Sequence, residues 1–227
     1  MNTRVFRDVG RAMSNKRYRL GINILENERR RRTLSEGEEY LRALLYDHLA
    51  ARLRTNTDLR RRYLNIALAM YRSILGRNPR YFHALLRIGK IWEIRGHFKK
   101  ALSYQTKAYR LMLKLPRADR GALAIGSTYE AMGNLRQAER WYKREAQAML
   151  PDDFGTIANL LQFYLRVGKQ RSALRLAPKL RILLRKEYSK QLYRGLGMRR
   201  SKYFRTIRAA LEKAEAHPPL YTIRRRS

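Results

Sequence analysis

Apolar residues recur along the chain at intervals of three and four, the spacing that places side chains on one face of an α-helix. The run 35–53 carries a stripe of leucines, and it begins with Ser35 three residues before Glu38, as in a helix capping box. The run 201–216 carries a second apolar stripe that includes Phe204. No stretch shows the alternation that is typical of a β-strand. The pattern predicts an all-α protein.

Three stretches, 84–104, 121–142 and 157–177, share small and aromatic residues at fixed offsets. The second follows the first by 37 residues and the third follows the second by 35. Periods of this length are typical of a helical repeat array. The residues in register are Gly89 with Gly126; Trp92 with Tyr129 and Tyr164; Gly96 with Gly133 and Gly168; and Ala101 with Ala138 and Ala173.

Each shared position has a packing reason. Gly89 and Gly126 fall inside a helix, where glycine costs about 1 kcal/mol relative to alanine. We therefore expect a neighbouring helix to cross there too closely for a Cβ atom. Gly96, Gly133 and Gly168 are expected to end the first helix of each pair in the left-handed conformation. Because one helix pair cannot bury both of its faces, neighbouring pairs must stack.

These positions resemble the tetratricopeptide repeat, whose pattern includes aromatic residues, glycines, alanines and a closing proline. The resemblance covers the ranges 82–116, 119–151, 154–178 and, in part, 64–79, where no first helix can be recognised before Pro79. Pentatricopeptide repeats, which read RNA bases, have a similar period. The glycine inside the first helix and the closing prolines favour the tetratricopeptide interpretation.

The resemblance implies a right-handed helical-repeat solenoid with helical flanks at both ends. It also implies a concave groove, lined by the first helices, that holds a protein segment. Some members of the family bind a terminal carboxylate with a clamp of Lys, Asn and Arg, but Lys90 and Asn159 are too scattered here to build one. The positions that would face the groove are Leu86, Lys90, Leu123, Ser127, Ala158, Asn159 and Gln162.

The chain is expected to have five parts along its length. The first part, residues 1–34, is rich in arginine. It is compatible with an organelle transit peptide or with an ordinary basic amphipathic helix. No apolar run approaches the roughly 18–20 residues of a membrane-spanning helix, and we expect an intracellular protein of the cytoplasm or the mitochondrial matrix. The parts are a basic segment 1–34, a helical flank 35–63, the repeat array 64–178, basic helices 179–216 and a basic tail 217–227.

The net charge of the chain predicts a polyanionic partner in addition to the repeat fold. The 227 residues include 52 Lys and Arg against 18 Asp and Glu, a net charge of +34, and 39 of the 52 are arginines. Too few carboxylates exist to pair these cations internally, so the surplus repels itself unless a polyanion neutralises it. Nucleic acid is such a partner, and arginine suits bidentate contact with phosphate. A basic bias of the whole proteome is the alternative explanation.

The basic residues gather in clusters, and the segment 179–227 has the highest charge density, with 15 basic and 3 acidic residues. We expect it to make the main contact with RNA. Tyr203 lies inside a cluster, where an aromatic ring can stack on a base. The candidate RNA-binding residues are Arg29, Arg30, Arg31, Arg32, Arg60, Arg61, Arg62, Arg199, Arg200, Lys202, Tyr203, Arg205, Arg208, Arg224, Arg225 and Arg226.

Enzyme signatures are missing from the sequence. There is no cysteine, and the four histidines lie far apart, so neither thiolate chemistry nor a zinc site is indicated. No Gly-Lys-Ser/Thr phosphate loop occurs. We expect a non-enzymatic protein without a cofactor or metal that assembles an RNA-rich complex, for which a ribosome, including an organellar one, is the natural example. The alternative is a protein-only adapter whose charge meets an acidic protein or an anionic membrane surface; oligomeric state stays open.

Overall fold

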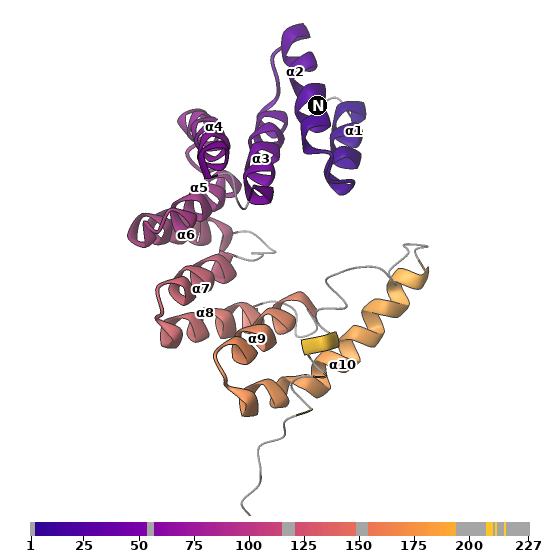
Figure 1. Cartoon of the computed structure of the whole chain (residues 1–227), viewed down its shortest axis with the longest axis vertical. Coiled ribbons are helices and arrows are strands. Elements are labelled where there is room, and N and C mark those ends of the chain that lie inside the picture. The colour runs from indigo at the N-terminus through magenta and orange to yellow at the C-terminus, as the bar shows by residue number, and fades with distance from the viewer. Residues whose placement is uncertain are drawn as a thin grey trace, which may run out of the picture. The chain divides into compact units, whose positions relative to one another are not determined.

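The computed structural model describes residues 3–53, 57–114, 121–148, 154–193, 208–210, 212 and 216, almost all of them in helices. The chain divides into two compact units, Met1–Pro116 and Arg117–Ser227, which we call unit 1 and unit 2. Among the described residues there is no β-strand, so the all-α prediction is confirmed. Figure 1 labels the helices of each unit.

Unit 1 consists of helices that pack in consecutive antiparallel pairs, α1 with α2, α3 with α4 and α5 with α6. Helix α2 also packs against α3, and α4 packs against α5, as stacked hairpins require. The helices are α1 (Thr3–Ser14), α2 (Tyr18–Arg31), α3 (Glu36–Arg52), α4 (Thr57–Arg77), α5 (Phe82–Ile94) and α6 (Phe98–Met112).

Unit 2 repeats the arrangement with α7 (Gly121–Ala131), α8 (Leu135–Ala148), α9 (Phe154–Arg166) and α10 (Gln170–Tyr193). Helix α7 pairs with α8 and α9 pairs with α10. The core of unit 2 contains the large aromatic side chains of Tyr142, Phe163 and Tyr164, and Phe163 is completely buried.

The turns between paired helices are confirmed in detail. Gly96, Gly133 and Gly168 have φ angles of 75°, 76° and 74°. After each of them, the next backbone N–H donates to the carbonyl of the aromatic residue five positions earlier, as in the hydrogen bond from His97 N to Trp92 O at 2.9 Å. This bond defines the Schellman motif, which satisfies carbonyls at the helix end. The glycines therefore end the first helices as predicted.

The turn between α1 and α2 has the same geometry without a glycine. Lys16 has a φ angle of 57°, and the following residue, Arg17, donates to the carbonyl of Ala12 at 2.8 Å. The carbonyl of Lys16 also accepts a hydrogen bond from Arg52 at 3.0 Å. Helices α1 and α2 are therefore a further hairpin of the array, and lysine in the place of the turn glycine hid it from the sequence pattern.

Replacing Lys16 by glycine is expected to stabilise the chain by about 0.5–1 kcal/mol, because it removes the steric cost of a side chain at positive φ. The midpoint of thermal unfolding, Tm, should rise by a few degrees. The matched control is Gly96→Ala, where an added Cβ meets no atom within 4 Å and only backbone strain is introduced. That variant should lower Tm, and a Lys16→Gly variant that also lowers it would contradict this explanation.

Three expectations about the array are corrected by the helix boundaries and the core packing. Helix α3 is the first helix of the hairpin that ends before Pro79, so this hairpin does not lack a first helix. The expected boundary at 63/64 lies inside α4, and the one at 178/179 lies inside α10, which continues through Pro178. The segment 1–34 is not separate either, because Val5 and Val9 of α1 are buried in a core cluster with Leu45 of α3.

Candidate functional site

The first helices of two neighbouring hairpins meet through polar and aromatic side chains that we call the α3–α5 face. It consists of Tyr40 and Asp47 on α3, Tyr81 at the N-cap of α5, and His83 and Arg87 within α5. The Tyr40 ring lies 5.5 Å from that of Tyr81 and 5.7 Å from that of His83, measured between centroids. An arginine, a histidine and tyrosines on one face can bind a peptide through hydrogen bonds and ring contacts.

Asp47 and Arg87 form the ionic contact of this face. Arg87 Nη1 lies 3.4 Å from Asp47 Oδ2, and the Asp47 side chain is nearly buried, whereas that of Arg87 is 36% exposed. Burial raises the pKa of the Asp47 carboxyl, and the charge of Arg87 opposes this shift only in part. Burial, and then the charge of Arg87, lower the pKa of His83. The Arg87 side chain is thus the more accessible member of the pair.

Tyr71 of α4 packs against this face from the core. It is completely buried, and its ring centroid lies 5.8 Å from that of Tyr40. Burial raises the pKa of Tyr71 well above its usual range. Among the described residues, no group forms a hydrogen bond with its hydroxyl. The sequence pattern did not indicate the polar neighbours that surround Tyr71.

The predicted groove residues divide between the units. Leu86 and Lys90 lie on α5 in unit 1, and Lys90 is exposed and paired with Glu93. The other five belong to α7 and α9 of unit 2, where four are half-buried: Leu123, Ser127, Asn159 and Gln162. Ala158 is completely buried in the core of unit 2, so its side chain presents no surface to a ligand and that prediction is wrong.

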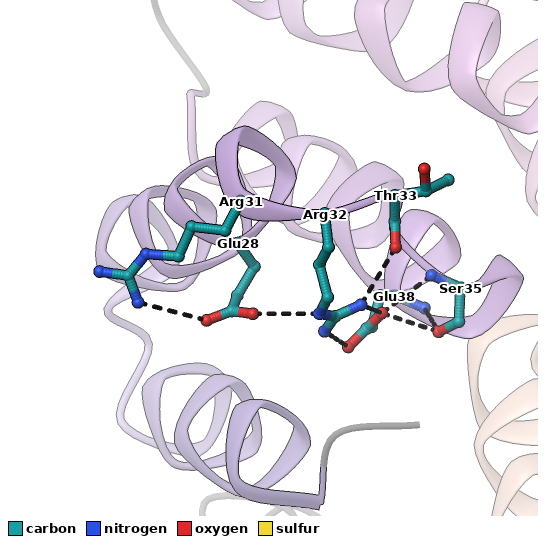
Figure 2. Close-up of polar contacts among 6 residues, drawn as sticks. All are labelled: Glu28, Arg31, Arg32, Thr33, Ser35 and Glu38. Atoms are coloured by element: carbon teal, nitrogen blue, oxygen red, sulfur yellow. Dashed lines mark hydrogen bonds and ion pairs between the residues drawn. The ribbon is translucent and has the colours of Figure 1, made fainter.

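The arginine cluster at the end of α2 is largely occupied with local contacts (Figure 2). Arg32 donates to both oxygens of Glu38, with Nη2–Oε1 at 2.6 Å and Nη1–Oε2 at 3.0 Å, and its Nε donates to Glu28 at 3.2 Å. Arg29 pairs with Glu26 at 3.0 Å, and Arg31 lies 4.0 Å from Glu28. Because the Arg32 guanidinium joins α2 to α3, we correct its assignment from RNA contact to structural contact.

Glu38 also completes the capping box that the sequence predicted. Its Oε2 accepts from the backbone N–H and the hydroxyl of Ser35, each at 2.9 Å, and its own N–H donates to Ser35 Oγ. Hydrogen bonds from Arg32 lower the pKa of Glu38, despite its burial, from 4.5 to about 2. Figure 2 shows the Glu38 carboxylate between Arg32 and Ser35, where α2 ends and α3 begins.

Glu38→Gln is expected to destabilise the chain by about 2 kcal/mol at pH 7, since it removes the carboxylate that accepts two charge-assisted hydrogen bonds from Arg32. The folded-state pKa is lowered, so this stability is present above pH 4.5 and is lost as the pH falls toward 2. Urea unfolding of both proteins at a series of pH values measures the difference. Asp8→Asn, which removes two exposed ion pairs on α1, should change little. A difference between Glu38→Gln and the native chain that persists at pH 2 would contradict the assignment.

The cluster at the start of α4 is less neutralised. Arg61 lies 3.7 Å from Asp58 in an exposed pair. Arg60 and Arg62, like Arg30 on α2, have no ion-pair partner among the described residues. Arg208 is exposed and pairs with Glu212 at 3.1 Å. The other predicted RNA-binding residues, Arg199, Arg200, Lys202, Tyr203, Arg205, Arg224, Arg225 and Arg226, lie outside the described residues.

The described residues hold no group of three or more His, Asp and Glu side chains that could bind a metal ion. None of the helices described is both long enough and apolar enough to cross a membrane.

Comparisons with known proteins identify the fold. No protein-family model matches the sequence, and no curated protein sequence matches it. A thermophilic tetratricopeptide repeat protein of Thermus thermophilus is similar in structure, with a TM-score of 0.67 and 18% identity over 96% of this chain and 100% of that one. A tetratricopeptide repeat protein of Parabacteroides merdae gives 0.59 and 17%, over 92% and 82%.

MamA of Desulfovibrio magneticus, from its residue 41 to its end, has a TM-score of 0.56 and 15% identity over 80% of this chain and 94% of its own. Identities this low relate folds and carry no residue roles from one protein to another. The chain therefore has a tetratricopeptide-like helical-repeat fold.

Proposed function

We propose that this chain is a non-enzymatic scaffold that joins a protein partner to RNA in a ribonucleoprotein complex. The observation that carries the proposal is the combination of stacked helical hairpins with a net charge of +34. Stacked hairpins present extended surfaces that bind proteins. A surplus of cations this large is best neutralised by a phosphate backbone.

The protein partner is proposed to bind the α3–α5 face. His83, Arg87 and Lys90 follow one another at intervals of four and three, which places them on one side of α5. His83 and Lys90 are exposed, and Arg87 is exposed in part. A protein segment with acidic and apolar side chains would match the charges of Arg87 and Lys90, the His83 ring and the neighbouring tyrosines. In unit 2 the half-exposed groove positions Leu123, Ser127, Asn159 and Gln162 are proposed to contact protein as well.

RNA is proposed to bind the arginines that lack carboxylate partners. These include Arg30, Arg60 and Arg62 in unit 1. The basic segment 179–227 remains a proposed contact because of its charge density. Contacts of this kind neutralise phosphates and position the chain on RNA without reading its sequence.

The protein half of the proposal is tested by capture of partners from cell extract after nuclease treatment. A partner bound to the α3–α5 face should be retained without RNA and should be lost when His83 and Lys90 are changed to alanine. The matched control changes the exposed Lys99 and Lys107 of α6 to alanine, which removes at least as much positive charge from another helix. If the two double variants retain the same partners, the α3–α5 face is not the binding surface.

The competing function is a protein-only adapter for an acidic partner. It predicts that nuclease changes neither the captured proteins nor their amount, and that the purified chain has no measurable affinity for RNA.

A further inference from the structure

Cations from three consecutive helices converge on one indole ring in unit 1. The charged groups lie 4.8 Å (Lys100 Nζ), 5.3 Å (Arg95 Cζ) and 6.0 Å (Arg72 Cζ) from the centroid of the Trp92 ring. Trp92 belongs to α5, Arg72 to α4 and Lys100 to α6, and Arg95 caps the end of α5. We call these four residues the Trp92 cluster. Such distances are within the range of cation–π attraction.

The Trp92 ring is held in place by the core of the unit. It is half-buried and packs against the buried cluster formed by α3, α4 and α5. The His97 ring meets it edge to face, with the centroids 5.3 Å apart. Because the ring is fixed, the cations around it are held in one place before any ligand arrives, which reduces the entropy lost on binding.

No carboxylate neutralises these cations among the described residues. Arg95 donates to the neutral amide oxygen of Asn65 at 2.6 Å. The nearest acidic residue in sequence, Glu93, is paired with Lys90. Burial, followed by the charges of Arg72 and Arg61, lowers the pKa of Arg95. Neighbouring cations that repel one another gain stability when an anion binds between them.

The cluster continues along α4 as a line of polar groups. Arg61, Asn65 and Arg72 are separated by four and seven residues, which places them on one face of the helix. At 1.5 Å per residue this line is about 16 Å long. Successive phosphates of a duplex DNA strand are about 3.4 Å apart along the helix axis, and an RNA strand spaces its phosphates on the same scale of a few ångströms. A single carboxylate or free phosphate would occupy only part of the line, whereas a backbone with several phosphates would follow it.

We infer that the Trp92 cluster, together with the Arg61–Arg72 line of α4, is a binding site for the phosphodiester backbone of RNA. The inference rests on the proposed RNA-binding function and places one contact within the repeats of unit 1. The arginine guanidinium groups bind phosphate oxygens in bidentate fashion, and Lys100 adds a point charge. Trp92 positions the cations. Since its ring is already surrounded by cations and by His97, the site binds backbone and does not select a base.

The test is a titration of fluorescein-labelled RNA with the full chain, followed by anisotropy at several salt concentrations. Changing Arg72, Arg95 and Lys100 to glutamine should weaken RNA binding by at least about tenfold and reduce the salt slope by up to about three units. The matched control changes Arg7, Arg19 and Arg80, three exposed cations elsewhere in unit 1, to glutamine. The control should weaken binding by less than about threefold.

A double variant and a fluorescence measurement distinguish a loss of binding from a loss of structure. The double variant Arg72→Gln and Lys100→Gln leaves the Arg95–Asn65 hydrogen bond intact, and it should still bind RNA more weakly than the control. In a Trp141→Phe background, Trp92 is the single tryptophan, and its fluorescence should change as RNA binds to the chain. Circular dichroism establishes that the helical content of each variant is unchanged.

The possible results distinguish an error in the proposed site from an error in the proposed function. If the native chain binds RNA and the site and control variants bind it equally, the site is wrong while the proposed function stands. If the native chain binds no RNA, both are wrong. If Trp92 fluorescence responds to polyglutamate or to vesicles that contain phosphatidylserine at lower concentration than to RNA, the site belongs to another polyanion and the RNA assignment is overturned.

Discussion

Raising the salt concentration from 50 to 200 mM is expected to weaken RNA binding by the full chain by roughly 250- to 1,000-fold. The net charge of +34 is spread over several clusters, and neutralising about six phosphates would release enough counterions for a slope of log K against log salt near −4 to −5. Measurement of the dissociation constant at four or more salt concentrations gives this slope directly.

Affinity that depends on phosphate contacts should also depend little on sequence. Homopolymeric RNAs of equal length are therefore expected to bind with dissociation constants within about tenfold of one another, because backbone contacts carry no base information. A flat salt dependence, or strong preference for one short sequence, would contradict binding by backbone neutralisation.

Gly89→Ala is expected to destabilise the chain by about 1–3 kcal/mol, although alanine is the better helix former. A Cβ at this position would lie 2.6 Å from Gln105 Cγ and 3.1 Å from the carbonyl oxygen of Ala101. Gln105 is completely buried and the carbonyl belongs to the α6 backbone, so neither can move without separating α5 from α6. Urea unfolding of the full chain measures the loss.

Gly126→Ala is the matched control at the equivalent position of unit 2. The added Cβ would lie 3.4 Å from Trp141 Cβ and from the Tyr142 ring, which is ordinary van der Waals contact. The expected close crossing is therefore confirmed at Gly89 and wrong at Gly126. The control should be neutral or should stabilise the chain by up to about 1 kcal/mol. Equal effects of the two substitutions would show that the crossing distance does not decide the outcome.

Much of the fold could be predicted because its signals are local. The turn glycines Gly96, Gly133 and Gly168 and the capping box of Ser35 and Glu38 depend on residues within one turn of helix, and the structure has them as predicted. The α1–α2 hairpin was missed because lysine occupies its turn position, where the pattern requires glycine. A search for buried aliphatic spacing, such as that of Val5 and Val9, could have found it.

The candidate sites were less predictable because they depend on contacts between helices. The Arg29–Arg32 run suggested free charge, but Glu38 lies on the next helix and binds Arg32. Conversely, Arg72 and Arg95 are single residues in the sequence, and only the packing of α4 against α5 brings both to Trp92. Clusters along the chain therefore do not reveal which arginines have a carboxylate partner on a neighbouring helix.

The nucleic-acid content of the full chain, purified at low salt and measured before and after nuclease treatment, tests the central claim most directly. The proposed scaffold should carry RNA that ribonuclease removes, that deoxyribonuclease leaves in place, and that high salt releases. A chain that is free of RNA at low salt, while a protein partner remains bound through nuclease treatment, would contradict the RNA-binding function and support the protein-only adapter.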